Sequence, residues 1–266
     1  MQVRNDILFH ALHADGLLML SNCGDAGSAR IAAAAGSKAL ATSSAAVAWS
    51  HGFADGSTLP RELLMASVKA ILRVSSLPLT VDAEDGYSAD PAQVAGLIGE
   101  LIDAGVAGIN IEDGGGTPAL LAEKIRAIRA VADARGVNLF INARTDVYLR
   151  GVDANLRVQE VLARAALYEA AGASGLFVPG ITAEDDIAAV VKATPLPLNV
   201  MVRDGVPAPA RLAQLGARRL SAGSAISEAM FGCIDTLTRQ FLDSGKVAAA
   251  PYAPMGYSAL NRLMTQ

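Results

Sequence analysis

The chain alternates short apolar runs with longer helical stretches, and this alternation constrains its fold more than any other feature. Eight runs have the length and nearly continuous apolar character of strands that are buried on both faces. They are residues 17–20, 39–42, 79–82, 107–111, 139–142, 175–178, 198–201 and 218–221. The helical stretches between them are residues 29–35, 61–75, 91–104, 119–135, 154–171, 183–192 and 209–215. Strands that alternate with helices predict a parallel sheet with helical crossovers.

Boundary signals support this division of the chain. Asp90 followed by Pro91 predicts an N-cap and a first helical residue. Gly105, Gly172 and Gly216 occur in similar phrases and predict a helix end, a tight turn and the next strand. Eight such units favour an α/β TIM (β/α)8 barrel, whereas a doubly wound sheet would have fewer strands and a glycine-rich phosphate turn after the first.

The sequence continues beyond the last predicted strand with an extra C-terminal helical segment. We expect residues 1–266 to form a single barrel domain, with residues 224–266 as a tail that contains helices at 225–244 and 258–264. An apolar helix outside a closed barrel requires a partner surface, so we expect this tail to make contacts in a homo-oligomer, either a dimer or a tetramer.

The composition excludes several classes of protein. Hydrophobic residues make up 52% of the chain and charged residues 18%, so a large core is expected. The net charge of -4 and the lack of a basic stripe argue against a nucleic-acid partner. No signal peptide or long apolar membrane segment is apparent, and the two cysteines lack metal-binding spacing. We therefore expect a soluble cytoplasmic protein with no membrane partner.

Charged residues follow three of the predicted strands. Asp82, Glu84, Glu112 and Arg144 would meet at the carboxyl edge if these strands were neighbours in a parallel sheet. Clustered carboxylates repel one another unless a cation holds them, and oxygen ligands without His or Cys suit a hard ion such as Mg2+. The guanidinium fork of Arg144 suits an anionic substrate, such as a carboxylate or a phosphate.

Five motifs resemble the isocitrate lyase / phosphoenolpyruvate mutase superfamily. They are residues 22–31 (Asn-x-x-Asp-Ala-Gly-Ser-Ala-Arg-Ile), 41–45 (Ala-Thr-Ser-Ser-Ala), 82–87 (Asp-x-Glu-x-Gly-Tyr), 111–113 (Ile-Glu-Asp) and 143–146 (Ala-Arg-Thr-Asp). Their order and spacing are consistent from about residue 10 to about residue 235. The resemblance implies a modified TIM barrel that binds Mg2+, with Mn2+ as an alternative ion, and acts on α-oxo or α-hydroxy carboxylates.

The resemblance also implies roles for particular residues. Asp82 matches the carboxylate that binds Mg2+ directly. Glu84, Glu112 and Asp55 match acidic positions that hold the ion mostly through its waters. Arg144 matches the arginine that contacts the oxo-acid, so Arg144, Asp55 and Glu112 form the expected catalytic set. The expected substrate-binding residues are Ser43, Ser44, Ala45, Arg144 and Asn199, the last at the end of a predicted strand.

Two departures from the superfamily pattern limit the expected chemistry. Many members have a long loop after the Glu-Asp pair that carries a catalytic Cys, but here residues 114–118 read Gly-Gly-Gly-Thr-Pro. Typical isocitrate cleavage is therefore not expected. The mutases have a His after the sixth strand, where this chain has Val178-Pro179-Gly180. Both departures leave the proton-transfer group unidentified. Among the remaining candidates, His10 and His13 are expected at the surface and Cys23 in the core.

The expected function is that of a Mg2+-dependent carbon–carbon lyase. It would cleave, or reversibly form, a C–C bond in a small α-oxo or α-hydroxy dicarboxylate through a pyruvate-enolate-like intermediate. The alternative enzyme is a phosphoenolpyruvate/phosphonopyruvate mutase or a phosphonopyruvate hydrolase. A non-catalytic barrel that binds an oxo-acid is the alternative of another class.

Overall fold

Eight parallel strands form a closed barrel in the computed structural model, which describes residues 4–247 and 253–265. Residues 1–3, 248–252 and 266 of the predicted domain and tail lie outside the described residues. The strands pair in sequence order, and β1 closes the barrel by pairing with β8. They are β1 Leu18–Cys23, β2 Leu40–Thr42, β3 Leu79–Asp82, β4 Gly108–Glu112, β5 Phe140–Arg144, β6 Gly175–Phe177, β7 Leu198–Met201 and β8 Arg219–Ser221. The predicted TIM barrel is confirmed.

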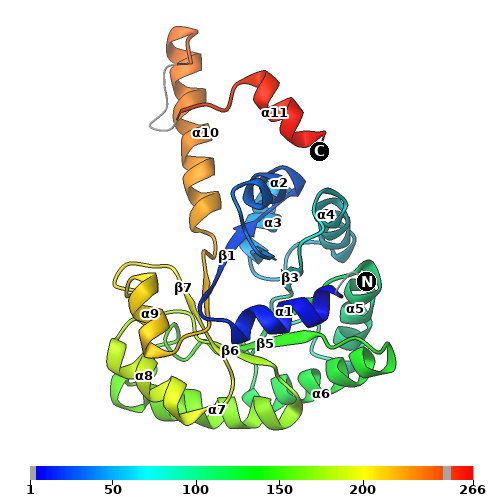
Figure 1. Ribbon diagram of the computed structural model, residues 1–266, viewed down its shortest axis with the longest axis vertical. Coiled ribbons are helices and arrows are strands. Elements are labelled where there is room, and N and C mark those ends of the chain that lie inside the picture. Colours follow the sequence, from blue (N-terminus) through cyan, green and yellow to red (C-terminus); the bar gives the residue numbers. More distant parts are fainter. Residues whose placement is uncertain (1–3, 248–252, 266) are drawn as a thin grey trace.

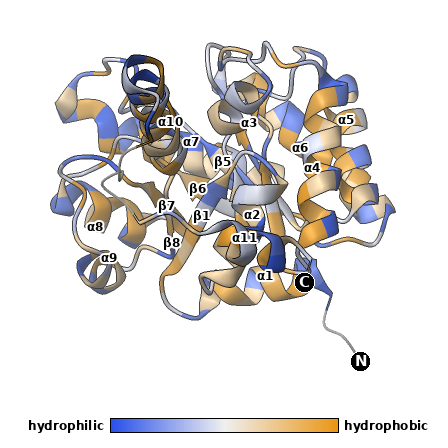
Figure 2. Cartoon of the chain, turned by 90° about the horizontal axis from the view of Figure 1, so that it is seen from above, coloured by the Kyte–Doolittle hydropathy of each residue, from blue (hydrophilic) through white to orange (hydrophobic). Residues whose placement is uncertain are grey.

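Helices surround this barrel and extend beyond it (Figure 1). They are α1 Asn5–Ala14, α2 Ala26–Ala34, α3 Ser44–Ser50, α4 Arg61–Val74, α5 Pro91–Ala104, α6 Pro118–Ala134, α7 Arg157–Ala171, α8 Glu184–Ala193, α9 Pro209–Leu215, α10 Ala225–Ser244 and α11 Tyr257–Met264. Apolar residues concentrate on the strands and on the helix faces toward them (Figure 2). No helix in the described ranges combines the length and hydropathy needed to cross a bilayer.

The boundary signals act as expected. The Asp90 carboxylate accepts a hydrogen bond from the Ala92 N–H at 2.9 Å, so it caps α5, with Pro91 as the first helical residue. Gly105 and Gly172 end α5 and α7 with φ of 105° and 103°, a left-handed conformation that favours glycine. These turns deliver the chain directly into β4 and β6.

Two helices were not predicted from the sequence. The first, α3, has seven residues and is too short for apolar periodicity to appear, although Ser43 caps it by accepting from the Ala46 N–H at 3.4 Å. The second, α1, begins after Arg4 without a side-chain cap. The predicted helix at 154–171 also begins later, because residues 154–156 form a 3-10 turn before α7.

The amino-terminal end of the barrel is closed by α1, which crosses it in Figure 1. His13 stacks on Phe140 with ring centroids 4.0 Å apart, and Phe9 meets Phe140 edge-on. His13 is buried, so the expectation that it lies at the surface is wrong. The physical reason is that α1 turns inward as a plug, and an imidazole presents a flat apolar face for stacking.

The middle of the barrel is polar, which is unusual for a fold whose interior is dominated by Val, Ile and Leu. Arg219 of β8 is fully buried and reaches across the barrel, where its Nη2 donates to the Asn110 side chain at 3.1 Å. Asn142 donates to the same Asn110 oxygen at 2.9 Å. Burial lowers the pKa of Arg219 to about 9. This polar layer lies between the α1 plug and the carboxyl ends of the strands.

The tail leaves the barrel after β8. In Figure 1, α10 runs away from the barrel and α11 returns beside α2. The Arg30 Nε of α2 donates to the Leu263 carbonyl of α11 at 2.8 Å. In α10, Ile226, Ile234 and Phe241 are each at least half exposed. The extra C-terminal helical segment is therefore present, and its role in oligomer contacts stays a prediction.

Candidate active site

The predicted site residues gather where neighbouring strands end. In the barrel register, Asp82 of β3 lies opposite Asn110 of β4, and Glu112 of β4 lies opposite Arg144 of β5. These strands are adjacent and parallel, so their carboxyl ends open onto the same face. In barrels of this kind, that face carries the chemistry.

Arg144 is the cation at the centre of this group. Its Nη1 lies 2.7 Å from a Glu112 oxygen, while its Nε and Nη2 donate to the two Asp146 oxygens at 2.7 and 3.1 Å. The guanidinium also lies over the Phe177 ring, 5.7 Å from its centroid. Burial works against the charge of Arg144, but the Glu112 and Asp146 carboxylates outweigh it and raise its pKa above the usual range.

Asp82 lies at the end of β3 and is buried. Its oxygens accept from the Ser44 and Glu84 backbone N–H groups at 3.3 and 3.4 Å, which are long hydrogen bonds. Burial raises the pKa of Asp82, and nearby Arg144 and these two N–H groups lower it. Among the described residues no cation forms an ion pair with Asp82, although the charges of Arg144 and Arg219 act on it from a longer distance.

Glu84 follows in a turn with positive φ, at 51°, and Tyr87 in the same turn has φ of 60°. Non-glycine residues in this region store strain, which is typical of functional sites. Glu84 accepts from Tyr87 Oη at 2.8 Å and from the backbone N–H and hydroxyl of Ser57. Burial raises the pKa of Glu84, although these hydrogen bonds oppose the shift. The carboxylate thus joins the turn after β3 to the loop before α4.

Three neighbouring carboxylates act on Glu112. Burial raises its pKa to about 8, and the Arg144 charge only partly offsets this. The neighbouring charges of Asp82, Asp146 and Glu84 raise the pKa further. One guanidinium therefore fails to neutralise the group, and an added divalent cation would relieve the repulsion.

Within the described ranges, no three His, Cys, Asp or Glu side chains already converge as they would around an ion. Glu112 turns toward Arg144, and Glu84 turns toward Ser57 and Tyr87. The oxygen-only donor set and its mutual repulsion nevertheless fit a hard cation. The metal roles of Asp82, Glu84 and Glu112 stay predictions.

The remaining predicted residues surround this group. Asp55 is exposed in the loop before α4, but its charge raises the pKa of both Asp82 and Glu84, so it acts on the same site. Ser43, Ser44 and Ala45 form the turn into α3, next to Asp82. The first-turn N–H groups of a helix have no acceptor within it and suit a carboxylate.

Asn199 lies on β7 and is completely buried. Its Oδ1 accepts from Ser221 Oγ at 3.3 Å, and its Nδ2 is a buried donor with no protein partner in the described part of the chain. Its substrate-binding role stays a prediction.

Cys23 was expected in the core. It is buried and its thiol donates to the Ala41 carbonyl at 3.2 Å. Burial raises the pKa of the thiol to about 12, which favours the core role. His51 Nε2 forms a hydrogen bond with the Ser67 hydroxyl of α4 at 2.8 Å.

Sequence reasoning missed two residues that hold Asp113 in place beside this site, Arg164 and Tyr168. Asp113 accepts from Arg164 Nη1 at 2.6 Å and from Tyr168 Oη at 2.8 Å, both on α7. Arg164 and Tyr168 belong to no recognisable motif, and only their positions one turn apart on a helix facing Asp113 reveal the role. The loop from Asp113 to Thr117 is short, as expected, because α6 begins at Pro118.

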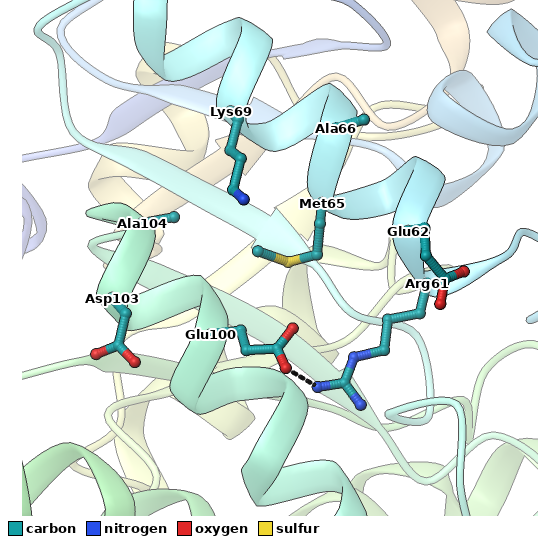
Figure 3. Close-up of a pocket in the computed structure, with 8 residues that line it drawn as sticks. All are labelled: Arg61, Glu62, Met65, Ala66, Lys69, Glu100, Asp103 and Ala104. Carbon is teal, nitrogen blue, oxygen red and sulfur yellow. Dashed lines mark hydrogen bonds and ion pairs between the residues drawn. The ribbon is translucent and has the colours of Figure 1, made fainter.

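A groove on the outside of the barrel is a competing location for a site. Figure 3 shows it between α4 and α5, with Met65 at its base and charged side chains at its rim. Arg61 and Glu100 across the groove pair at 2.6 Å, and Asp103 pairs with Arg135 at 2.8 Å. No strand end contributes to this groove, so the barrel mouth is the better candidate.

Comparisons with known proteins agree with this geometry. The sequence profile of the phosphoenolpyruvate phosphomutase family matches residues 9–242. An uncharacterized protein of Mycobacterium tuberculosis (strain ATCC 25618 / H37Rv) is 36% identical over 221 residues, which cover 81% of each chain. An oxaloacetate decarboxylase of Bradyrhizobium sp. (strain BTAi1) is 37% identical over 145 residues, which cover 51% of this chain and 48% of that protein.

Solved structures share the fold. A protein of Burkholderia cenocepacia J2315, provisionally named a phosphonomutase, is 40% identical with a TM-score of 0.84, and the match covers 89% of this chain and 98% of that one. A 2,3-dimethylmalate lyase of the PEP mutase/isocitrate lyase superfamily has a TM-score of 0.87 over 98% of this chain and 95% of that one. Its sequence identity is 24%, so this similarity concerns the fold alone.

Proposed function

This chain belongs to the phosphoenolpyruvate phosphomutase family, within the PEP mutase/isocitrate lyase superfamily of lyases and mutases, and from that premise we propose its reaction. The proposed enzyme is a Mg2+-dependent carbon–carbon lyase acting on a small α-oxo or α-hydroxy dicarboxylate. The resemblance drawn from the five motifs is confirmed at the level of the family, as is its implication of an enzyme. The metal, the substrate and the site residues remain proposals.

One observation carries the proposal. Carboxylates from neighbouring strands meet around a single guanidinium, and burial with mutual repulsion raises the pKa of Glu112 to about 8. A site with this excess of acidic groups repels an anionic substrate until a cation is added. Metal-assisted chemistry on an oxo-acid is the activity that this arrangement supports best.

In the proposed site, Asp82 would hold Mg2+ directly, with Glu84, Glu112 and Asp55 around it. When bound, the ion would supply Lewis-acid stabilisation of the negative charge that develops on substrate oxygens. Arg144 adds a second fixed positive charge, since Asp146 holds its Nε and Nη2. Donors that are fixed before the reaction stabilise developing charge without reorganising.

The turn into α3 would bind the substrate carboxylate. The Ser44 N–H lies 3.3 Å from Asp82, so this turn and the proposed metal ligand are in contact. The Ser44 hydroxyl and the Ala45 N–H would face the carboxylate, while Ser43 fixes the turn through its cap on α3. Arg144 and this turn would then orient the substrate from two sides.

Phosphonate chemistry is the second candidate. The specific observation in its favour is the 40% identity to the Burkholderia cenocepacia protein provisionally named a phosphonomutase. Against it, residues 178–180 read Val-Pro-Gly where the mutases have a His. The oxaloacetate decarboxylase match favours the C–C reaction, although it covers about half of each chain.

The test is product formation from a panel of oxaloacetate, 2-alkylmalates, 2-methylisocitrate and phosphonopyruvate, with Mg2+ and with EDTA. Pyruvate released from one of the C–C substrates only with Mg2+ would support the lyase. Pyruvate from phosphonopyruvate alone would support the second candidate. Tight oxalate binding with no product from any compound would contradict both and favour a barrel that binds oxo-acids without turnover.

A further inference from the structure

We propose that Asp113, Arg164 and Tyr168 form a positioning device that fixes the guanidinium of Arg144 through Asp146. None of the three residues touches the proposed substrate position directly, so they are positioning residues. The consequence for turnover rests on the proposed function, in which Arg144 contacts the substrate. The structural part, which concerns the orientation of Arg144, does not depend on that function.

The first step of the device is the contact between Asp146 and Arg144. Two parallel hydrogen bonds of 2.7 and 3.1 Å join the Asp146 carboxylate to Nε and Nη2. This bidentate geometry fixes the plane of a guanidinium as well as its distance. The third nitrogen, Nη1, remains directed toward Glu112. The position of Asp146 therefore sets the position of Arg144.

The second step holds Asp146 itself. Its backbone N–H donates to Asp113 Oδ1 at 3.2 Å. The Asp113 backbone N–H in turn donates to the Arg144 carbonyl at 3.3 Å. Asp113 thus joins the end of β4 to the first residues after β5 through both its side chain and its backbone.

The third step ties Asp113 to a rigid element. Its other oxygen, Oδ2, accepts from Arg164 Nη1 at 2.6 Å and from Tyr168 Oη at 2.8 Å. The Asp113 side chain is 1% exposed and Tyr168 is completely buried. Arg164 and Tyr168 are four residues apart on α7, so they face the same side of that helix. Both Asp113 oxygens are therefore used, one toward the site and one toward α7.

The segment after β5 is held in several ways. Val147 is buried in the core, and the Asp146 carbonyl accepts from the Leu149 and Arg150 N–H groups at 2.9 and 3.0 Å. These contacts fix the course of the backbone, and the Asp113 carboxylate is the side-chain acceptor that holds the Asp146 N–H at the edge of the site. Small displacements of a positioned group reduce turnover strongly, so this anchor should matter for catalysis.

The direct test observes Arg144 in full-length protein labelled with 15N-arginine. The Nε–H signal is assigned by its disappearance in Arg144→Lys, and its hydrogen exchange is then followed in Asp113→Asn and Tyr168→Phe. We expect the wild-type signal to be protected, the protection to be lost in Asp113→Asn and to be reduced in Tyr168→Phe. This readout needs no substrate and no metal.

Tyr148→Phe is the matched control, because Tyr148 Oη donates to the Asp186 carboxylate at 2.7 Å but does not contact Asp113. Its Arg144 signal should match the wild type. If the active substrate is identified, Asp113→Asn should lower kcat about 10- to 100-fold with a smaller change in KM. If the wild type turns over none of the candidate substrates, the proposed function is refuted, whereas the exchange result remains valid.

An unchanged Arg144 Nε–H exchange rate in folded Asp113→Asn would overturn the proposal, even if activity fell, since Asp113 would then act by another route. Should Asp113→Asn fail to fold, Tyr168→Phe decides, because it removes one hydroxyl and no other atom. Wild-type protection in Tyr168→Phe would then contradict the device.

Discussion

At the scale of the residue, the site depends on how one arginine is shared among carboxylates. Arg144 is bound by Glu112 and Asp146 at 2.7 Å each. Even so, burial and the neighbouring charges of Asp82 and Glu84 raise the pKa of Glu112. Arg144 therefore does not neutralise all of the carboxylates at the barrel mouth, and its effect depends on where its guanidinium is held. A guanidinium with fixed orientation performs a role here that a mobile ammonium does not.

Arg144→Lys tests this role. A lysine keeps the charge but makes neither the bidentate pair with Asp146 nor the second contact to Glu112. We expect kcat/KM for the active substrate to fall about 100-fold or more, the size of effect seen when a fixed donor to developing charge is removed. The matched control is Arg135→Lys, which disrupts a similar bidentate pair with Asp103 at 2.8 and 3.1 Å on the outer surface. Equal losses in both variants would make Arg144 structural.

At the scale of the element, the repeating strand–helix units and the two tail helices were predicted from the sequence, and two other helices were missed. All eight strands were predicted because each is an apolar run followed by a break, and α5 and α9 were predicted to the residue. The helices α1 and α3 were missed because one lacks a side-chain cap and the other has too few residues to show periodicity. The carboxylate cluster was predictable from the strand ends, whereas its anchor on α7 required the spatial contact.

His13 in α1 provides a test of the plug. Burial lowers its pKa to about 3, so the fold keeps it neutral while the unfolded chain gains a proton below its usual pKa of 6.5. The contribution is fully present above pH 6.5 and is lost as the pH falls toward 3. We expect the free energy of unfolding of His13→Phe, relative to that of the wild type, to rise by up to about 2 kcal/mol as the pH falls from 7.5 to 5. Denaturant unfolding curves of both proteins measure this, and parallel pH profiles would contradict the account.

At the scale of the whole molecule, α10 projects from the closed barrel and leaves apolar side chains exposed in the described structure. The helix α10 has Ser227 as its one buried residue among those described, while Ile226, Ile234 and Phe241 are at least half exposed. Apolar side chains along 20 residues of projecting helix favour association with another copy. The tail is therefore proposed to hold a dimer or tetramer together.

The double substitution Ile234→Glu and Phe241→Glu tests this proposal. We expect sedimentation or light scattering to give a multiple of the chain mass for the wild type and a smaller particle for the variant, since buried glutamates in an apolar contact are unfavourable. Thr236→Glu, an exposed position on the opposite face of the same helix, is the control and should leave the mass unchanged. A monomeric wild type would end the oligomer proposal.

The central claim is that the carboxylates at the barrel mouth bind a divalent cation, and calorimetric titration of Mg2+ and Mn2+ in the presence of oxalate tests it most directly. The wild type, Asp82→Ala and the surface variant Asp103→Ala are compared. The account predicts one ion per chain for the wild type and Asp103→Ala, and loss of binding in a folded Asp82→Ala protein. Equal binding by all three variants, or no binding by the wild type, would contradict it.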